Sequence, residues 1–203
     1  QLLLDIHALG VPAATEFLDL MTVRYVDDLV SWAAIGARTT ESPMHRQAAS
    51  GLPMPIGFKN GTDGNVKVAI DALAVARAPH HYLAVSMDGR IEVASSRGNS
   101  AAHIVLRGGR KPNYDSASLD AACAELELAR MRPAVLVDAS HGNSGKVARA
   151  QLDVCADLAR RIAEGETRVA GVMVESNLAP GRQDIVPGAQ LAYGQSVTDE
   201  CLG

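Results

Sequence analysis

Three permanent cations, Arg38, Lys59 and Arg107, each follow a short apolar run of the sequence. Gathered around one pocket, three positive charges repel one another unless anions occupy the site. Arginine forks match carboxylate and phosphate oxygens, and lysine adds a point charge. The pattern favours a compact ligand that bears both a phosphate and a carboxylate. The alternative is that each cation has its own acidic neighbour, such as Glu41 or Asp63.

His141, Glu175 and Asp199 offer one imidazole nitrogen and two carboxylates in the second half of the chain. Such donors suit a divalent transition metal such as manganese, iron, cobalt or zinc. A lone histidine after a strand is more often a hydrogen-bonded loop residue than a ligand, and no spacing motif decides between the two interpretations here. Cys201 is interpreted as a small buried residue rather than a thiolate ligand, and Lys146 as the start of a helix.

Short apolar segments alternate with stretches of helical periodicity along the whole chain. The segments predicted as strands are 13–17, 33–36, 56–58, 103–106, 134–137 and 169–174. The predicted helices are an opening one that ends at Gly10, and 22–31 (with Thr22 as its N-cap), 44–50, 66–76, 116–129 and 147–163. Asp88-Gly89 predicts a two-residue hairpin turn between strands at 82–87 and 90–95, and 176–195 is expected to be a loop.

Alternating strands and helices indicate parallel β-α units in an α/β fold. The alternatives are a doubly wound open sheet and a (β/α)8 TIM barrel, of which this chain would cover about strands 3 to 8. The charged residues favour the barrel, because the carboxyl ends of barrel strands converge on one face where active sites are built. Glu16, near the end of the first predicted strand, would join that face. We therefore expect one partial barrel domain over residues 1–203, with an inserted hairpin at about 82–95.

The overall composition is that of a globular protein, with 203 residues, 47% hydrophobic and 21% charged. The net charge of −4 argues against a nucleic-acid partner. Three widely spaced cysteines imply no disulfide framework, which fits a reducing, cytoplasmic setting. No apolar run approaches the roughly 20 residues of a membrane span, and no signal peptide is expected. The abrupt beginning and end of the sequence are interpreted as truncations.

Seven blocks spread over the chain resemble the microbial, aromatic-amino-acid-regulated type of 3-deoxy-D-arabino-heptulosonate 7-phosphate (DAHP) synthase. These blocks are long, and they follow the family's order. They are Gly36-Ala-Arg-Thr-Thr-Glu-Ser42, Gly57-Phe-Lys-Asn-Gly-Thr-Asp-Gly64, Leu106-Arg-Gly-Gly109, Lys111-Pro-Asn-Tyr114, Asp138 through Asn143, Gly171-Val-Met-Val-Glu-Ser176 and Tyr193-Gly-Gln-Ser-Val-Thr-Asp199.

The resemblance implies a (β/α)8 barrel and a metal-dependent, aldol-like condensation. Phosphoenolpyruvate and D-erythrose 4-phosphate would give DAHP and phosphate, the first step of the shikimate pathway. By resemblance, the phosphoenolpyruvate clamp is Arg38, Lys59 and Arg107, and the same pocket is lined by Glu16, Gly36 and Ala37. By resemblance also, the metal ligands are His141, Glu175 and Asp199, with Lys59 and His141 as the catalytic residues and Asp199 touching substrate.

The resemblance further implies a homo-oligomer at full length and feedback inhibition by an aromatic amino acid. The effector would bind near Arg24, Gly51, Leu52, Pro53, Tyr82, Ala84 and Ala94. The family's cysteine metal ligand and its Lys-Pro-Arg-Thr segment do not occur in this sequence, so the isolated chain is expected to be inactive. The alternatives are a barrel fragment that only binds or assembles, and a sibling synthase that uses arabinose 5-phosphate. The 36–42 and 111–114 blocks argue against the sibling.

Overall fold

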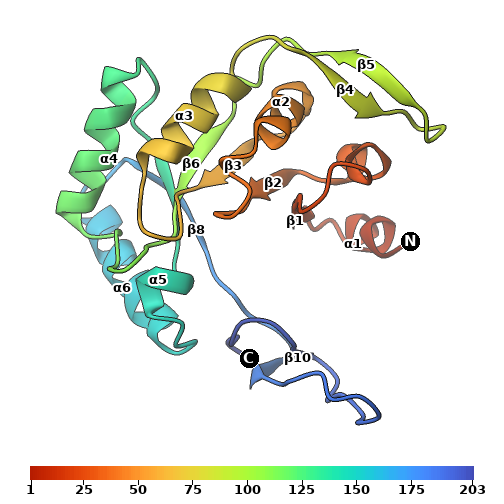
Figure 1. The fold of residues 1–203 in the computed structure, drawn as a ribbon. Coiled ribbons are helices and arrows are strands. Elements are labelled where there is room, and N and C mark those ends of the chain that lie inside the picture. Colours follow the sequence, from red (N-terminus) through yellow and green to blue (C-terminus); the bar gives the residue numbers. More distant parts are fainter.

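A curled sheet of six parallel strands forms the centre of the molecule in the computed structural model, which describes residues 1–203 (Figure 1). Its strands are β1 (Ala14–Glu16), β2 (Trp32–Ile35), β3 (Ile56–Lys59), β6 (His103–Leu106), β7 (Val135–Asp138) and β8 (Val169–Met173). They lie side by side in that order, so each strand pairs with the next one of the series. This serial parallel order is that of a TIM barrel and confirms the predicted fold class, with six strands present.

The longer helices connect the strands and pack along the outer side of the sheet, whereas the first helix precedes β1 and a short one stands at the carboxyl end of β7 (Figure 1). The helices are α1 (Leu2–Ala8), α2 (Pro43–Gly51), α3 (Lys67–Ala76), α4 (Ser116–Leu128), α5 (His141–Ser144) and α6 (Ala150–Ala163). Pro43 stands at the first position of α2, and the Ser42 side chain caps it by accepting the N–H of His45, as a helix start requires. No helix is long and apolar enough to cross a membrane.

The core lies between the strands and the helices. Twenty-six buried residues form one apolar cluster, in which Phe58, Ile104 and Leu106 are fully buried. The strand residues that alternate with these core residues face the inside of the curled sheet, since successive side chains of a strand point to opposite faces. On that inner face, the Trp32 indole N–H donates to Nε2 of His103 at 3.0 Å. Gly57 lies between their strands, where a Cβ would come within 2.5 Å of the Trp32 ring.

The predicted helix over 22–31 is wrong. The segment forms two single 3-10 turns, η1 (Val23–Tyr25) and η2 (Asp27–Leu29). Thr22 does not cap a helix; its backbone N–H and its hydroxyl both bond to the Asp19 carboxylate. That carboxylate also accepts the N–H of Met21, and such local side-chain bonds to the backbone compete with helix formation.

The inserted hairpin consists of β4 (His81–Val85) and β5 (Ile91–Ser95), which pair in antiparallel fashion away from the main sheet (Figure 1). Its turn differs from the predicted two-residue Asp-Gly turn. The N–H of Ser86 bonds to the carbonyl of Arg90 and the N–H of Gly89 bonds back to Ser86, which leaves three residues in the loop. Gly89 has φ +73°, the left-handed conformation that follows a type I turn in three-residue hairpin loops.

The predicted loop over 176–195 contains a short strand. β9 (Ala179–Arg182) pairs with β10 (Gln195–Ser196) in a small separate sheet. Gln183 joins the two sides of this segment by donating to the carbonyls of Ala192 and Gln195. Side-chain amide bonds of this kind between distant loop positions are not visible in a hydrophobic pattern.

We predict that protonation of His103 destabilises the fold. Burial lowers the pKa of His103, so between that lowered value and the unfolded value of about 6.5 the unfolded chain binds more protons. Stability should therefore rise with pH up to about pH 6.5, by at most about 1.4 kcal/mol per pH unit for one proton. Urea unfolding at pH 5 to 8 measures the slope, which the His103→Gln variant should reduce. The matched control is His81→Gln at an exposed site on the hairpin; equal slopes in both variants would contradict the assignment.

Candidate functional site

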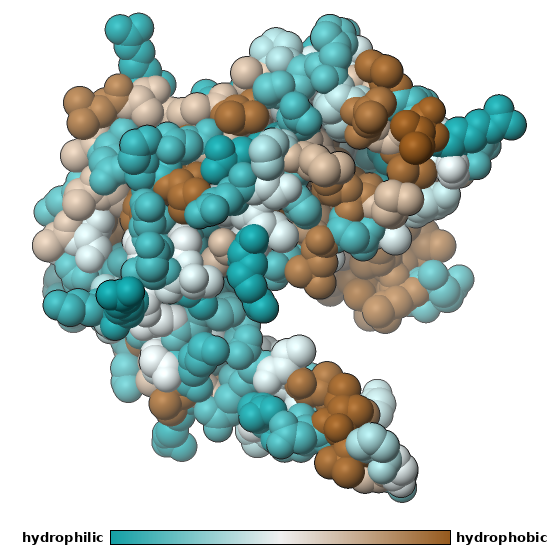
Figure 2. Space-filling model, in the orientation of Figure 1, coloured by the Kyte–Doolittle hydropathy of each residue, from teal (hydrophilic) through white to brown (hydrophobic).

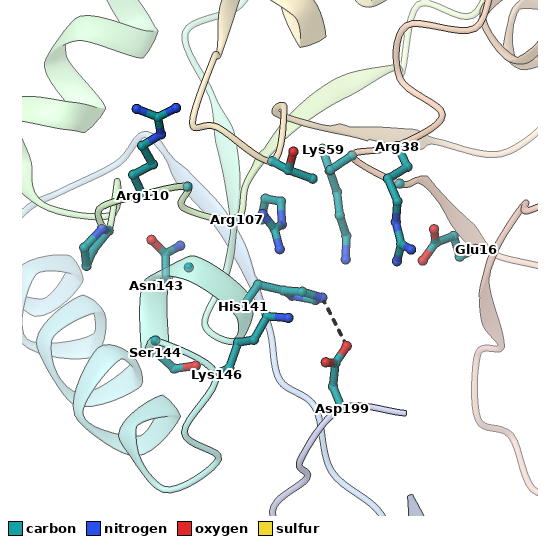
Figure 3. A pocket seen from close by; sticks show the side chains of 17 residues that line it. Glu16, Arg38, Lys59, Arg107, Arg110, His141, Asn143, Ser144, Lys146 and Asp199 are labelled. Atoms are coloured by element: carbon teal, nitrogen blue, oxygen red, sulfur yellow. Dashed lines mark ion pairs between the residues drawn. The ribbon is translucent and has the colours of Figure 1, made fainter. Parts of the chain in front are cut away.

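A polar cleft of about 890 Å³ opens at the carboxyl ends of the central strands (Figure 3). Side chains from five strand ends reach it. The predicted residues that line it are Glu16, Gly36, Ala37, Arg38, Lys59, Arg107, His141 and Asp199. Glu175 follows β8 and lies beside this cleft, with Oε1 at 3.4 Å from Nε2 of His141. Residues up to 183 positions apart in sequence thus meet at one face, as expected for the carboxyl end of a barrel.

The cations of this main cleft are not neutralised by separate acidic neighbours. Arg38 and Arg107 form no ion pair, and neither Glu41 nor Asp63 pairs with a cation, so that alternative is wrong. Lys59 is the exception, with Nζ at 3.0 Å from Oδ2 of the buried Asp138. In Figure 3 the side chains of Arg38, Lys59 and Arg107 point into the same space. The cleft can therefore hold an anion with more than one charged group.

Burial changes the electrostatics of two of these groups. Burial lowers the pKa of the Arg107 guanidinium, and the carboxylates of Asp138 and Asp199 counteract part of that effect. Because the pKa of arginine is very high, Arg107 stays charged at neutral pH. Burial alone would raise the pKa of Asp138, but His141 and Lys59 outweigh it and hold that pKa below its ordinary value. Asp138 is therefore an anion at neutral pH.

One imidazole nitrogen and two carboxylate oxygens lie together at the lower side of the cleft. Ligand atoms of His141, Glu175 and Asp199 all lie within 4.8 Å of one another, and Nε2 of His141 is 3.8 Å from Oδ2 of Asp199 (dashed in Figure 3). The donor types and their spacing fit a divalent transition metal. His141 also has φ +52°, a left-handed conformation that costs free energy in a non-glycine residue and tends to occur at functional sites.

Glu175 is held at its side chain and at its backbone. The hydroxyl of Ser140 donates to Oε2 at 2.7 Å. Gln151 of α6 is fully buried and bonds twice to the Glu175 backbone, donating to its carbonyl at 3.1 Å and accepting its N–H at 2.8 Å. Cys201 is buried, which confirms its interpretation as a small buried residue.

Sequence reasoning missed two further cations of the cleft, Arg110 and Lys146. Lys146 does not begin a helix as predicted; α6 begins at Ala150, and Lys146 has φ +63° after the left-handed Gly145. The other lining residues that were not singled out are Thr62, Gly109, Pro112, Gly142, Asn143, Ser144 and Gly145. Most belong to the glycine-rich blocks, whose backbones pack together: a Cβ on Gly142 would lie 2.5 Å from the amide nitrogen of Gly109.

A second pocket of about 430 Å³ lies between η1, α2 and the hairpin. Its walls are mostly apolar and include Arg24, Gly51, Leu52, Tyr82 and Ala84 of the predicted effector site. Pro53 and Ala94 do not line it. The Tyr82 hydroxyl occupies the space where a Cβ on Gly51 would stand, at 2.5 Å, and burial raises the pKa of this tyrosine.

The chain is about half identical in sequence to several curated proteins. It is 52% identical to a phospho-2-dehydro-3-deoxyheptonate aldolase of Haemophilus influenzae, covering 100% of this chain and 56% of that protein. It is also 52% identical to a Phe-sensitive phospho-2-dehydro-3-deoxyheptonate aldolase of Escherichia coli K12, covering 58% of that protein. A solved structure of a phospho-2-dehydro-3-deoxyheptonate aldolase from Francisella tularensis is 46% identical and superimposes with a TM-score of 0.95 over 99% of this chain and 59% of that one.

The chain thus spans 56% to 58% of the length of these curated relatives. A family model described as DAHP synthetase I matches residues 4–203, nearly the whole chain. The match contains both sides of the main cleft, from Glu16 to Asp199. Since the family model and the relatives both match nearly the whole of this chain, the chain belongs to the DAHP synthetase I family.

Proposed function

We propose that the protein containing this chain condenses phosphoenolpyruvate with D-erythrose 4-phosphate to give DAHP and phosphate, the first step of the shikimate pathway. The observation that carries the proposal is the main cleft, where three cations face a His–Glu–Asp group. Family membership supports the same reaction. We further propose that residues 1–203 belong to one catalytic barrel domain, with the hairpin as an insertion.

Phosphoenolpyruvate carries a phosphate and a carboxylate on a three-carbon unit, which matches the cations of the cleft in charge. Arg38, Lys59 and Arg107 bind and orient this anion, and Gly36 and Ala37 leave room for it. Arginine forks can hold phosphate and carboxylate oxygens in pairs, which fixes the direction of the ligand. Fixing C3 of phosphoenolpyruvate toward the aldehyde carbon is the positioning contribution of the clamp.

His141, Glu175 and Asp199 would hold a divalent ion, either manganese, iron, cobalt or zinc. When bound, such an ion supplies Lewis acidity to the aldehyde oxygen. C3 of phosphoenolpyruvate forms a bond to the aldehyde carbon, water adds at C2, and phosphate leaves with cleavage of its C–O bond. Throughout, Lys59 and the two arginines offset the charge of the anion, and Asp199 lines the cleft on the substrate side.

We also propose that the second pocket binds an aromatic amino acid as feedback inhibitor. Its apolar walls suit an aromatic side chain, and the Arg24 guanidinium can bind the carboxylate of the amino acid. In this structure a guanidinium nitrogen of Arg24 lies 3.4 Å from Oε1 of Glu92. Such an exposed ion pair contributes little to stability, so a ligand carboxylate can replace Glu92. A homo-oligomer and a cytoplasmic location belong to the same proposal; the three free cysteines are compatible with a reducing compartment.

The metal assignment predicts that His141→Ala in the full-length protein abolishes both tight Mn²⁺ binding and product formation. Removing the imidazole leaves this chain with only its two carboxylates to hold the ion, while the fold remains, because open metal sites are more catalytic than structural. Electron paramagnetic resonance of free Mn²⁺ measures the binding, and circular dichroism checks the fold. The exposed His81→Ala serves as control. Full turnover by His141→Ala in chelator-treated buffer would rule the assignment out.

The clamp predicts that Arg107→Ala raises the KM for phosphoenolpyruvate about ten- to a hundredfold, since a charge-assisted hydrogen bond is worth roughly 1.5–3 kcal/mol. Steady-state kinetics with the second substrate saturating measures the change. Arg97→Ala, which removes the same charge at an exposed site outside the cleft, should leave KM unchanged. An unaltered KM in Arg107→Ala would place the guanidinium outside the substrate site.

The six-stranded sheet predicts that residues 1–203, expressed alone, give no measurable product even with added Mn²⁺. Strands β1 and β8 are each paired on one side only, and open strand edges promote aggregation. Leu9, Val11, Val172 and Val174 are exposed near these edges, and Figure 2 shows further apolar patches on the hairpin and on the C-terminal segment. The Lys-Pro-Arg-Thr cations and the cysteine ligand would also be absent.

The assay compares residues 1–203 with the full-length protein, using both substrates and measuring solubility by size-exclusion chromatography. A soluble monomer of the 203-residue chain turning over at typical enzyme rates, about 1–1000 per second, would contradict this prediction.

A further inference from the structure

A buried carboxylate joins the two halves of the main cleft. Asp138, at the end of β7, has a side chain that is only 1% exposed. Its Oδ2 lies 3.0 Å from Nζ of Lys59 and 2.9 Å from Nδ1 of His141. We propose that Asp138 is a positioning residue that prepares His141 for metal binding and holds Lys59, while reducing the positive charge offered to the substrate. This inference rests on the proposed function of the cleft.

Asp138 itself is fixed in place. Its Oδ1 accepts the N–H of Ser140 at 2.9 Å, and its backbone carbonyl accepts from the buried Asn143 side chain at 2.8 Å. The strand ladder with β8 extends to Asp138, opposite Met173. A carboxylate held this firmly can orient its partners rather than follow them.

The orientation of the His141 ring follows from this contact. Nδ1 faces Asp138, so Nε2 faces Glu175 and Asp199. Nδ1 and Oδ2 are within hydrogen-bond distance, although they are not aligned as a hydrogen bond in this structure. A carboxylate favours a proton on Nδ1, which leaves the lone pair on Nε2, the form in which imidazole binds a metal.

The same oxygen acts against the substrate. The Asp138 carboxylate, next to Lys59, repels an incoming phosphate or carboxylate. The repulsion is strong because the side chains of Asp138 and Lys59 are shielded from water. Lys59 itself is only 7% exposed, so it needs a counter-ion while the cleft is empty. Asp138 therefore stabilises Lys59 and His141 at a cost to anion affinity.

The test is Asp138→Asn in the full-length protein. The amide keeps the size of the side chain and can still accept the Ser140 N–H, but it offers Nδ1 of His141 a donor where an acceptor stood. We expect Mn²⁺ alone to bind about 10- to 100-fold more weakly, measured by electron paramagnetic resonance without substrate. Phosphoenolpyruvate alone, titrated calorimetrically in chelator, should bind several-fold more tightly because a negative charge has gone.

Opposite shifts in the two affinities distinguish positioning from a purely structural role. Weakening of both ligands together with a lower melting temperature would overturn the proposal, and so would unchanged Mn²⁺ binding. Ser140→Ala is the matched control, because Ser140 bonds through its side chain to Glu175 and not to Lys59. It should weaken Mn²⁺ and leave metal-free phosphoenolpyruvate binding unchanged.

A second variant keeps the test decisive if Asp138→Asn does not fold. Lys59→Met removes one of the two partners of Asp138, so Mn²⁺ should bind more tightly. Arg38→Met removes an equal charge from the same cleft without a contact to Asp138, and Mn²⁺ should gain less affinity than it does in Lys59→Met. Equal effects of these two variants would overturn the proposal. If His141→Ala binds Mn²⁺ normally, the assignment of the metal ligands is wrong. If His141→Ala loses Mn²⁺ but the Asp138 and Lys59 variants do not behave as expected, the metal assignment stands and the positioning role of Asp138 is wrong.

Discussion

The repulsion between cations that share one cleft is the constraint on which the rest of the site depends. Parallel pairing of β2, β3 and β6 brings Arg38, Lys59 and Arg107 to one edge whether or not their charges are balanced. The protein balances one of them internally, by the 3.0 Å contact of Lys59 with Asp138. It leaves the two guanidiniums for a ligand. The repulsion between these cations costs free energy in the folded state, as is common in functional clefts.

Close backbone packing of glycines is what lets the cleft have this shape. The loops after β3, β6 and β7 touch at Gly109 and Gly142, where any side chain would force them apart. Asn60 and Asn113 join the same loops: Asn60 accepts the N–H of Arg107, and Asn113 accepts the N–H of Gly108. With small residues at the contacts and amide side chains between them, the loops carry the charged groups on a scaffold that can hold them rigid.

The sequence predicted the parts of the structure that follow from period and burial, because strand ends and apolar alternation are local properties. The six strands, the order of the helices and the gathering of Glu16 to Asp199 at one face all follow from such patterns. Prediction failed where side chains compete with the backbone: Asp19 replaces the expected helix at 22–31 by turns. It failed again at Lys146, whose left-handed backbone is set by the turn after α5. Asp138 could be noted as charged, but its sharing between Lys59 and His141 required three-dimensional distances.

One helix connects the two pockets. The turn that carries Arg38 leads directly into α2, and α2 ends at Gly51 on the wall of the second pocket. At the cleft end, the buried Thr40 hydroxyl donates to the carbonyl of Lys59 at 2.8 Å, and Arg46 of α2 donates to the carbonyl of Thr40 at 2.7 Å. At the other end, the Tyr82 hydroxyl packs against Gly51. A packed helix moves as a unit, so a ligand that displaced Tyr82 would press on the element that positions both Arg38 and Lys59. The proposed feedback inhibition would need only a small shift of α2 along this route, because the proposed clamp would depend on the alignment of fixed charges rather than on their presence.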